Sequence, residues 1–204
     1  MMTKIVIPCF TPYVPANSVG ALGKWLSVPG TQLRITKHRS SKLGDYRPLN
    51  GGTQHLISVN GNLNKYAFLI TLVHEIAHMN NYIAYRSKVK PHGQEWKDEF
   101  KRLMAEFDLT SIFPDILLPK IESYMANPKA SSSSDISLSL ALREFDAKKE
   151  NHVVLSQIEE GAIFNTRNGR AFVRGARQKK RIKCKELKSG RLYLFSPIAE
   201  VIPA

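Results

Sequence analysis

The sequence predicts an α+β protein in which a mixed domain precedes a small antiparallel β-module. Residues 65–85 contain no Pro or Gly, and apolar side chains cover nearly every side of the segment up to His74, which is typical of a buried central helix. Two runs before it, around Leu33 and at 54–60, have the apolar pattern of strands. After His152 the chain breaks into short strand-like runs separated by Gly and Asn-Gly, as in a small sheet.

Each element ahead of the central helix has a boundary in the sequence. Residues 14–28 contain ANSVGALGKWLS, which predicts a short helix ended by Pro29-Gly30. The Gly44-Asp45 pair predicts a turn between the two strands. Asn64 is a good N-cap residue, so we expect the central helix to begin directly after it.

The segment behind the central helix predicts further helices. Pro91, His92 and Gly93 indicate a tight turn. Apolar residues then recur at helical spacing and predict a second core helix, through Trp96, Phe100, Leu103, Met104 and Phe107. Prolines interrupt the next stretch and leave one helix candidate, at about 115–126.

The run NPKASSSSD is the clearest linker signal, because it combines a Pro with four serines and ends in Asp135, which can cap a following helix. We therefore expect a first domain at 1–127, a linker and connector helix at 128–150, and a small basic β-module at 151–204. A module of roughly 50 residues is near the lower limit for independent stability, so we expect it to dock on the first domain.

The net charge of +13 is unevenly distributed. Between Arg167 and Arg191 the only acidic residue is Glu186, which indicates an anionic partner, with nucleic acid first and an acidic membrane surface second. A merely solvated basic surface is the alternative. The candidate nucleic-acid-binding residues are Arg174, Arg177, Lys179, Lys180, Arg181 and Lys183.

The two cysteines and the lack of long apolar runs indicate the cellular compartment of the protein. Cys9 and Cys184 lie far apart in the chain and have no partners at metal-ligand spacing, which favours a reducing cytoplasm over a disulfide framework. No apolar run approaches the roughly 18 residues that span a bilayer. Because the cysteines have no partners at metal-ligand spacing, any metal must be bound by His and carboxylate side chains.

The segment VHEIAH contains an H-E-x-x-H pattern. His74 and His78 are separated by four residues, so both project from one helix face and can bind a single tetrahedral ion. Glu75 points to the adjacent side, where it can act as general base on a water held by the metal. Buried histidines with ordinary structural contacts are the alternative, but burying two imidazoles and a carboxyl without a partner is costly.

Catalytic zinc sites usually have three protein ligands, so a third ligand is needed. His92 follows His78 by 14 residues, beyond the helix end, where a loop can fold back onto the site. Glu95 and Glu99 on the next helix are competitors. We prefer His92, because Pro91 and Gly93 fix it in a turn.

VHEIAH followed by HGQEW resembles the SprT-like family of zinc metalloproteases, whose pattern is HExxH, a loop, then His-Gly and an aromatic residue. The segments ITKHRSSKLGDYRP and HLISVN are also similar to the strands of the family, and the resemblance covers about residues 30–110. It implies a compact zincin-type fold with a central HExxH helix beside a small sheet. It also implies one Zn²⁺ per chain bound by His74, His78 and His92, with Glu75 as catalytic base.

The C-terminal region departs from the family pattern. Many members end in a zinc ribbon with four cysteines, whereas RIKCKELKSGRLYLFSPIAEV keeps only Cys184. A second, structural zinc is therefore not expected. Aromatic residues alternate with the charges here, and we expect them to fill a small core rather than to stack on bases: Phe164, Phe172, Tyr193 and Phe195.

Three functions are compatible with these features. The first is a hydrolase, a zinc-dependent endopeptidase acting on a protein or peptide substrate, and the resemblance to eukaryotic members extends this to DNA-associated proteins. The second is a non-catalytic nucleic-acid-binding protein with a structural metal site, against which the intact Glu75 argues, since such a site needs no general base. The third is a metallopeptidase without a nucleic-acid role.

Overall fold

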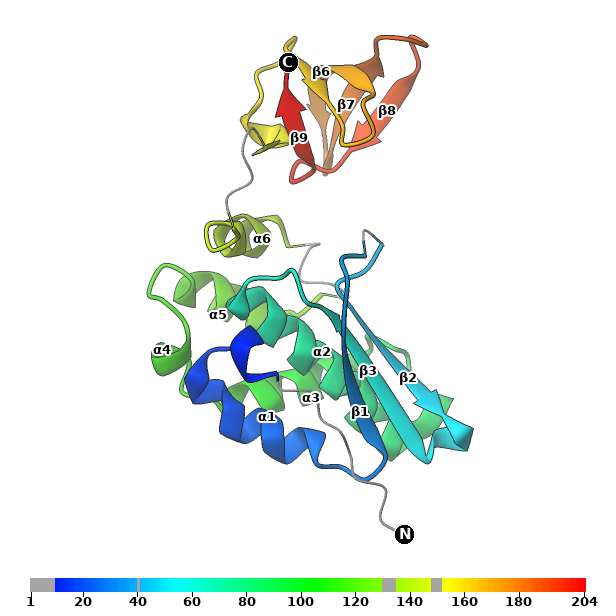
Figure 1. Ribbon diagram of the computed structural model, residues 1–204, viewed down its shortest axis with the longest axis vertical. Helices are drawn as coiled ribbons and strands as arrows, with labels where there is room; N and C mark the ends of the chain where they lie inside the picture. Colours follow the sequence, from blue (N-terminus) through cyan, green and yellow to red (C-terminus); the bar gives the residue numbers. More distant parts are fainter. Residues whose placement is uncertain (1–9, 40, 130–134, 148–151) are drawn as a thin grey trace. The chain divides into compact units, whose positions relative to one another are not determined.

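The computed structural model describes residues 10–39, 41–129, 135–147 and 152–204. It divides into two compact units, Met1–Asp146 and Ala147–Ala204 (Figure 1). Cys9, the four serines of the expected linker and the end of the expected connector segment, 148–150, lie outside the described residues.

The sheet of the first unit has three strands in the order β1-β3-β2. Strand β1 (Thr31–Thr36) runs parallel to β3 (Gln54–Asn60), and β2 (Gly44–Leu49) pairs with the other side of β3 in the antiparallel direction. The turn predicted at Gly44-Asp45 is wrong, because β2 begins there. Its Gly, Asp and Pro are turn formers, but Pro is tolerated in an edge strand and the pairing with β3 outweighs local preference.

Helix α2 (Lys65–Tyr85) is the central helix that the sequence predicts. Oδ1 of Asn64 accepts hydrogen bonds from the backbone N–H groups of Tyr66 and Ala67, at 3.1 and 3.0 Å, which satisfies the first turn. Most of its residues are buried, as expected for a helix that is apolar on nearly every side. Among the described residues, no helix combines the length and the apolar character needed to cross a bilayer.

The first unit contains further helices besides α2 (Figure 1). Helix α3 (Gln94–Ala105) confirms the predicted second core helix, since every residue of its apolar stripe and Phe107 just beyond it are buried. The remaining α-helices are α1 (Val19–Leu26), α4 (Leu109–Ile112), α5 (Leu118–Ala126) and α6 (Ile136–Arg143). Short 3₁₀ helices cover Thr11–Tyr13, Ala16–Ser18, Asn50–Gly52 and Arg86–Lys88.

Helix α6 is part of the first unit. Asp135 caps it as predicted, with its side chain accepting from the backbone N–H of Leu138 at 3.1 Å. Leu138, Ala141 and Leu142 belong to the core of this unit. The segment expected to be a connector helix therefore contributes to the packing of the first unit.

The second unit is a six-stranded antiparallel sheet in the order β4-β9-β5-β6-β7-β8. A 3₁₀ turn covers Leu155–Gln157. Phe164 and Phe172 are fully buried and stack at 5.6 Å, with Tyr193 and Phe195 packed against them, which confirms that these aromatic residues form the core. The strands are β4 (Val153–Val154), β5 (Ile163–Asn165), β6 (Ala171–Gln178), β7 (Arg181–Glu186), β8 (Leu192–Phe195) and β9 (Glu200–Pro203).

Candidate metal centre

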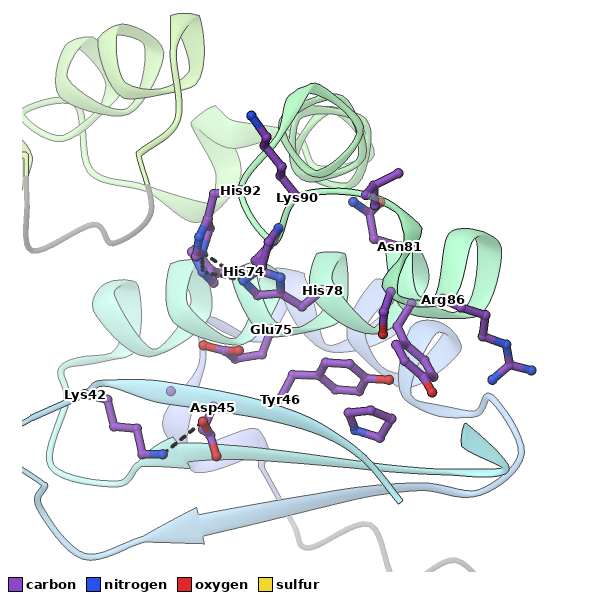
Figure 2. A pocket seen from close by; sticks show the side chains of 16 residues that line it. Lys42, Asp45, Tyr46, His74, Glu75, His78, Asn81, Arg86, Lys90 and His92 are labelled. Carbon is purple, nitrogen blue, oxygen red and sulfur yellow. Dashed lines mark hydrogen bonds and ion pairs between the residues drawn. The ribbon is translucent and has the colours of Figure 1, made fainter. Parts of the chain in front are cut away.

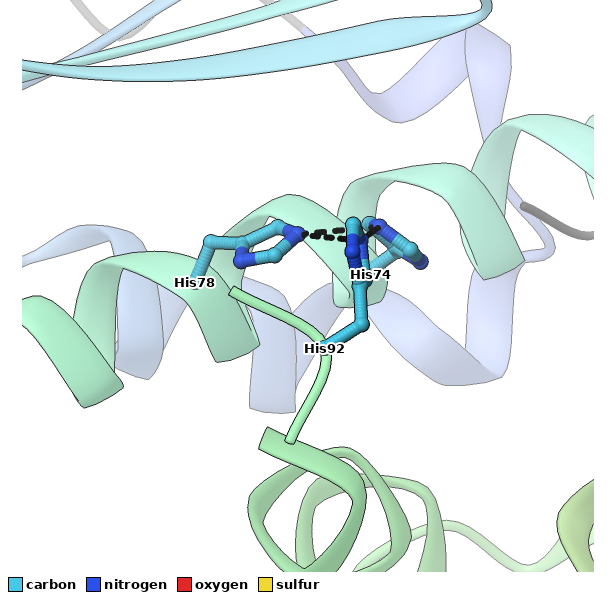
Figure 3. Close-up of side chains that lie close together, drawn as sticks. All are labelled: His74, His78 and His92. Carbon is cyan, nitrogen blue, oxygen red and sulfur yellow. Dashed lines mark hydrogen bonds between the residues drawn. The ribbon is translucent and has the colours of Figure 1, made fainter. Parts of the chain in front are cut away.

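Three imidazoles converge where α2 meets the turn before α3 (Figure 3). The Nε2 atoms of His74 and His78 lie 3.1 Å apart, and Nε2 of His92 lies 3.2 and 3.0 Å from them. Zinc–nitrogen bonds of about 2.0–2.1 Å at tetrahedral angles separate the nitrogens by about 3.3 Å. The three nitrogens therefore fit three corners of a tetrahedron around one small ion, and the group can hold a metal.

The surroundings of the imidazoles keep them neutral. Burial, together with the charges of its two neighbours, lowers the pKa of His74 to about 2. Burial and His92 lower the pKa of His78 to about 4, and burial lowers the pKa of His92. A neutral imidazole has a free lone pair on one ring nitrogen, which is the form that binds a metal.

Trp96 supports all three imidazoles from the core. Its ring lies 4.5, 5.5 and 5.0 Å from those of His74, His78 and His92, and it also stacks on Phe100 at 5.4 Å. Its Nε1–H donates to the backbone carbonyl of His74 at 3.4 Å. Trp96 is fully buried, so it joins the cluster to the hydrophobic core.

The two carboxylates that compete with His92 as the third ligand are not part of the histidine cluster. Glu99 accepts from the side-chain amide of Asn80 at 2.6 Å and forms an ion pair with Arg102 at 2.8 Å. Glu95 lies in the first turn of α3 and is exposed. The turn before that helix is closed by a hydrogen bond from Gly93 N–H to the carbonyl of Lys90, at 3.0 Å. This turn brings His92 to the other two imidazoles.

Glu75 lies on the side of α2 that faces β2 (Figure 2). Its side chain is 6% exposed. Burial, followed by the charge of Asp45, raises the pKa of Glu75 to about 8, whereas Arg39, Lys42 and a hydrogen bond from the Tyr46 backbone act in the opposite direction. The carboxyl is thus held out of bulk water and beside the imidazoles, in the same pocket.

Gly44 allows β2 to lie directly against Glu75. A Cβ at position 44 would lie 2.5 Å from Oε1 of Glu75 and 2.7 Å from Cγ2 of Thr71.

We expect Gly44→Ala to displace the Glu75 side chain, because the helix and the strand enclose it on both sides. Metal content by atomic absorption should stay unchanged, whereas the rate of any reaction that uses the Glu75 carboxyl should fall at least about tenfold. Gly20→Ala, where a Cβ would meet nothing within 4 Å, is the matched control.

A pocket of about 600 Å³ joins the three imidazoles and Glu75 to β2 and the turn at 86–92. Several residues that line this pocket are absent from the predicted site, because the local sequence pattern predicted a turn where β2 begins. Tyr46 extends from β2, and its hydroxyl lies 2.9 Å from Nδ1 of His55. Asn81 is buried, with its Nδ2 lacking a hydrogen-bond partner among the described residues. Asn81 could have been identified from the sequence, because it follows His78 by three residues and therefore lies on the same face of the helix.

The basic residues singled out from the sequence lie in the second unit and differ in their contacts. Arg177, Lys179, Lys180 and Arg181 are exposed at the hairpin between β6 and β7. Arg174 differs, since it forms an ion pair with Glu160 at 3.1 Å and its side chain is 16% exposed. Lys183 is half-buried in β7, opposite Leu194.

The comparison with family models gives one match. The model of the SprT-like family matches residues 20–115. This range contains β1, β2, β3, α2 and α3, and with them the three imidazoles and Glu75. Searches of curated proteins and of solved structures gave no match. The similarity to the SprT-like family therefore covers residues 20–115 of this chain.

Proposed function

We propose that this protein is a zinc-dependent endopeptidase in which Glu75 is the general base. The observation that carries this proposal is the shared pocket, lined by three converging imidazoles and a buried carboxyl. His74, His78 and His92 would bind the ion. Three neutral imidazoles suit zinc, and the set leaves a fourth position open, as catalytic zinc sites do.

The roles of the protein side chains follow from their positions. Zinc, when bound, polarises a carbonyl and lowers the pKa of a water toward about 7. In its ionised form, which a cation bound by the imidazoles would favour, Glu75 accepts the proton of the attacking water and delivers it to the leaving amine. The Tyr46 backbone N–H and the close approach of Gly44 hold the carboxyl in place for both transfers.

The metal content of purified protein tests the ligand set. We expect about one zinc per chain in the wild type and a large loss in His92→Ala, because two imidazoles bind zinc far more weakly than three. Cleavage of an unfolded protein substrate should stop on chelation and return when zinc is added. Glu95→Gln and Glu99→Gln are the matched controls. Full zinc in His92→Ala together with loss in either control would show that a carboxylate is the third ligand.

A structural metal site in a non-catalytic nucleic-acid-binding protein is the competing function. Such sites are usually closed by four protein ligands, mostly cysteines, whereas the candidate group among the described residues has three members, all of them histidines. A buried Glu75 beside this group also has no use in a purely structural site. Zinc-loaded protein that cleaves no peptide would favour this alternative.

We also propose that the second unit binds DNA and brings DNA-associated proteins to the peptidase. The supporting observation is the exposed β6–β7 hairpin, whose tip carries four cations on consecutive or nearly consecutive positions. Lys179 takes a positive φ of 50°, so the turn is tight and the charges are close together. Such a cluster of cations is suited to contacts with DNA phosphates, which do not depend on the base sequence.

Reversing the hairpin charges tests this tether. Changing Arg177, Lys179, Lys180 and Arg181 to Glu should lower DNA affinity at least about tenfold at low salt. It should also reduce the slope of log affinity against log salt by about 0.9 for each lost phosphate contact. Fluorescence anisotropy with a labelled oligonucleotide measures both. The control reverses four exposed cations of the first unit: Lys24, Arg34, Lys65 and Lys120. Equal losses in both variants would refute a specific role for the hairpin.

A further inference from the structure

The pocket extends beyond the imidazoles toward the C-terminal end of α2 (Figure 2). Tyr46 and Tyr82 form its walls here, with ring centroids 6.1 Å apart, and Pro48 lies beside them. Arg86 lines the end of this extension. This part of the pocket is thus aromatic along its sides and cationic at its end.

Arg86 is held in place by its backbone and by its neighbours. It leaves the helix with φ of 55° and ψ of −138°, a conformation that non-glycine residues rarely adopt. The guanidinium carbon lies 5.3 Å from the centre of the Tyr82 ring, and Nη1 donates to the carbonyl of Gly52 at 3.4 Å. A side chain at Gly52 would collide with both Arg86 and Tyr82. These contacts place the exposed guanidinium of Arg86 beside the aromatic wall.

The charge of Arg86 has no carboxylate partner within 4 Å among the described residues. The two acidic side chains of the pocket, Asp45 and Glu75, lie toward the other end of α2, near Lys42 (Figure 2). Asp45 already pairs with Lys42 at 2.9 Å and with Arg47 at 2.6 Å. The end of the pocket at Arg86 thus carries a positive charge that no carboxylate of the described residues pairs with.

We propose that this end of the pocket binds an acidic side chain of the substrate, through Arg86. This inference rests on the proposed peptidase function, because it places a peptide across the imidazoles. A guanidinium binds a carboxylate through parallel N–H···O bonds, and most of the N–H groups of Arg86 remain available. The rings of Tyr46 and Tyr82 pack against the methylene groups of a Glu side chain. The preferred substrates are peptides with Glu or Asp a few residues from the cleaved bond.

Binding to a catalytically inactive protein tests this without relying on turnover. Zinc-loaded Glu75→Gln protein is titrated with pairs of labelled peptides that differ by Glu against Gln at one position, scanned along the peptide. We expect one position at which Glu binds about threefold to tenfold more tightly. Arg86→Gln in the same background should remove this difference. Arg86→Lys should retain part of this difference, because lysine keeps the positive charge but lacks the planar guanidinium that forms two parallel hydrogen bonds.

Lys88→Gln is the matched control, since Lys88 follows in the same 3₁₀ turn but does not line the pocket. It should leave the preference for Glu unchanged. Equal affinities at every scanned position, or a preference that persists in Arg86→Gln, would overturn the proposal. So would an oligonucleotide that binds through Arg86 while the Glu peptide does not. A preference for Glu in a protein that cleaves no peptide would support the acidic site and contradict the peptidase function.

Discussion

Glu75→Gln should leave metal binding intact and lower peptide cleavage by about 10²–10⁴-fold, the range that a positioned general base contributes. Glutamine has the same shape, so it fits the narrow space beside Gly44. Its carbonyl still accepts from the Tyr46 backbone N–H, and the buried position then carries no ionisable group. The loss would therefore report proton transfer alone. Zinc content and single-turnover cleavage of a quenched fluorescent peptide measure the two effects.

Glu99→Gln provides the comparison for this variant. Glu99 is a carboxyl on the neighbouring helix that contacts Asn80 and Arg102 and does not line the pocket. It should keep both zinc and cleavage. If Glu75→Gln cleaves peptide at the wild-type rate, the mechanism proposed here is wrong.

Trp96→Ala should destabilise the protein by about 3–5 kcal/mol and also weaken zinc binding. The first effect follows because a fully buried indole is removed from the core. The second follows because the same ring contacts all three imidazoles and its N–H binds the carbonyl of His74. Urea denaturation with and without zinc gives the stability change. Competition with a coloured chelator gives the metal affinity.

Trp25→Ala is the matched control for this substitution. Trp25 is also buried in the core of the first unit, but it packs on Phe107 and donates to Glu106 at 3.2 Å. It should lower stability by a similar amount and leave the intrinsic zinc affinity of the folded protein unchanged. Equal weakening of zinc binding in both variants would show that Trp96 acts through general stability and not through the imidazoles.

The central helix and its metal-ligand pattern could be predicted because their signals are local. Residues 65–85 lack helix breakers, Asn64 caps them, and the spacing of His74 and His78 fixes their common face. The stripe that begins at Trp96 was equally clear, because apolar residues at helical spacing leave few alternatives.

Local sequence patterns predicted a turn where strand β2 begins, because the stability of this strand comes from tertiary pairing. Gly44, Asp45 and Pro48 all favour turns locally, and only the ladder to β3 makes this segment a strand. The pocket residues on this strand were missed for the same reason. Arg86 was missed because its position depends on a positive φ and on Gly52, and neither leaves a periodic pattern in the sequence.

Because β2 is an edge strand, local unfolding affects the two parts of the site differently. His74, His78 and His92 lie close together in sequence, so the loop that joins them closes at little cost in chain entropy. Gly44 and Tyr46 reach the pocket through a strand with a single neighbour, which detaches at a lower free energy than the interior of the fold. Local opening of this strand removes the wall beside Glu75 while the histidine cluster persists. Bound metal is therefore a poor measure of an intact pocket in this protein.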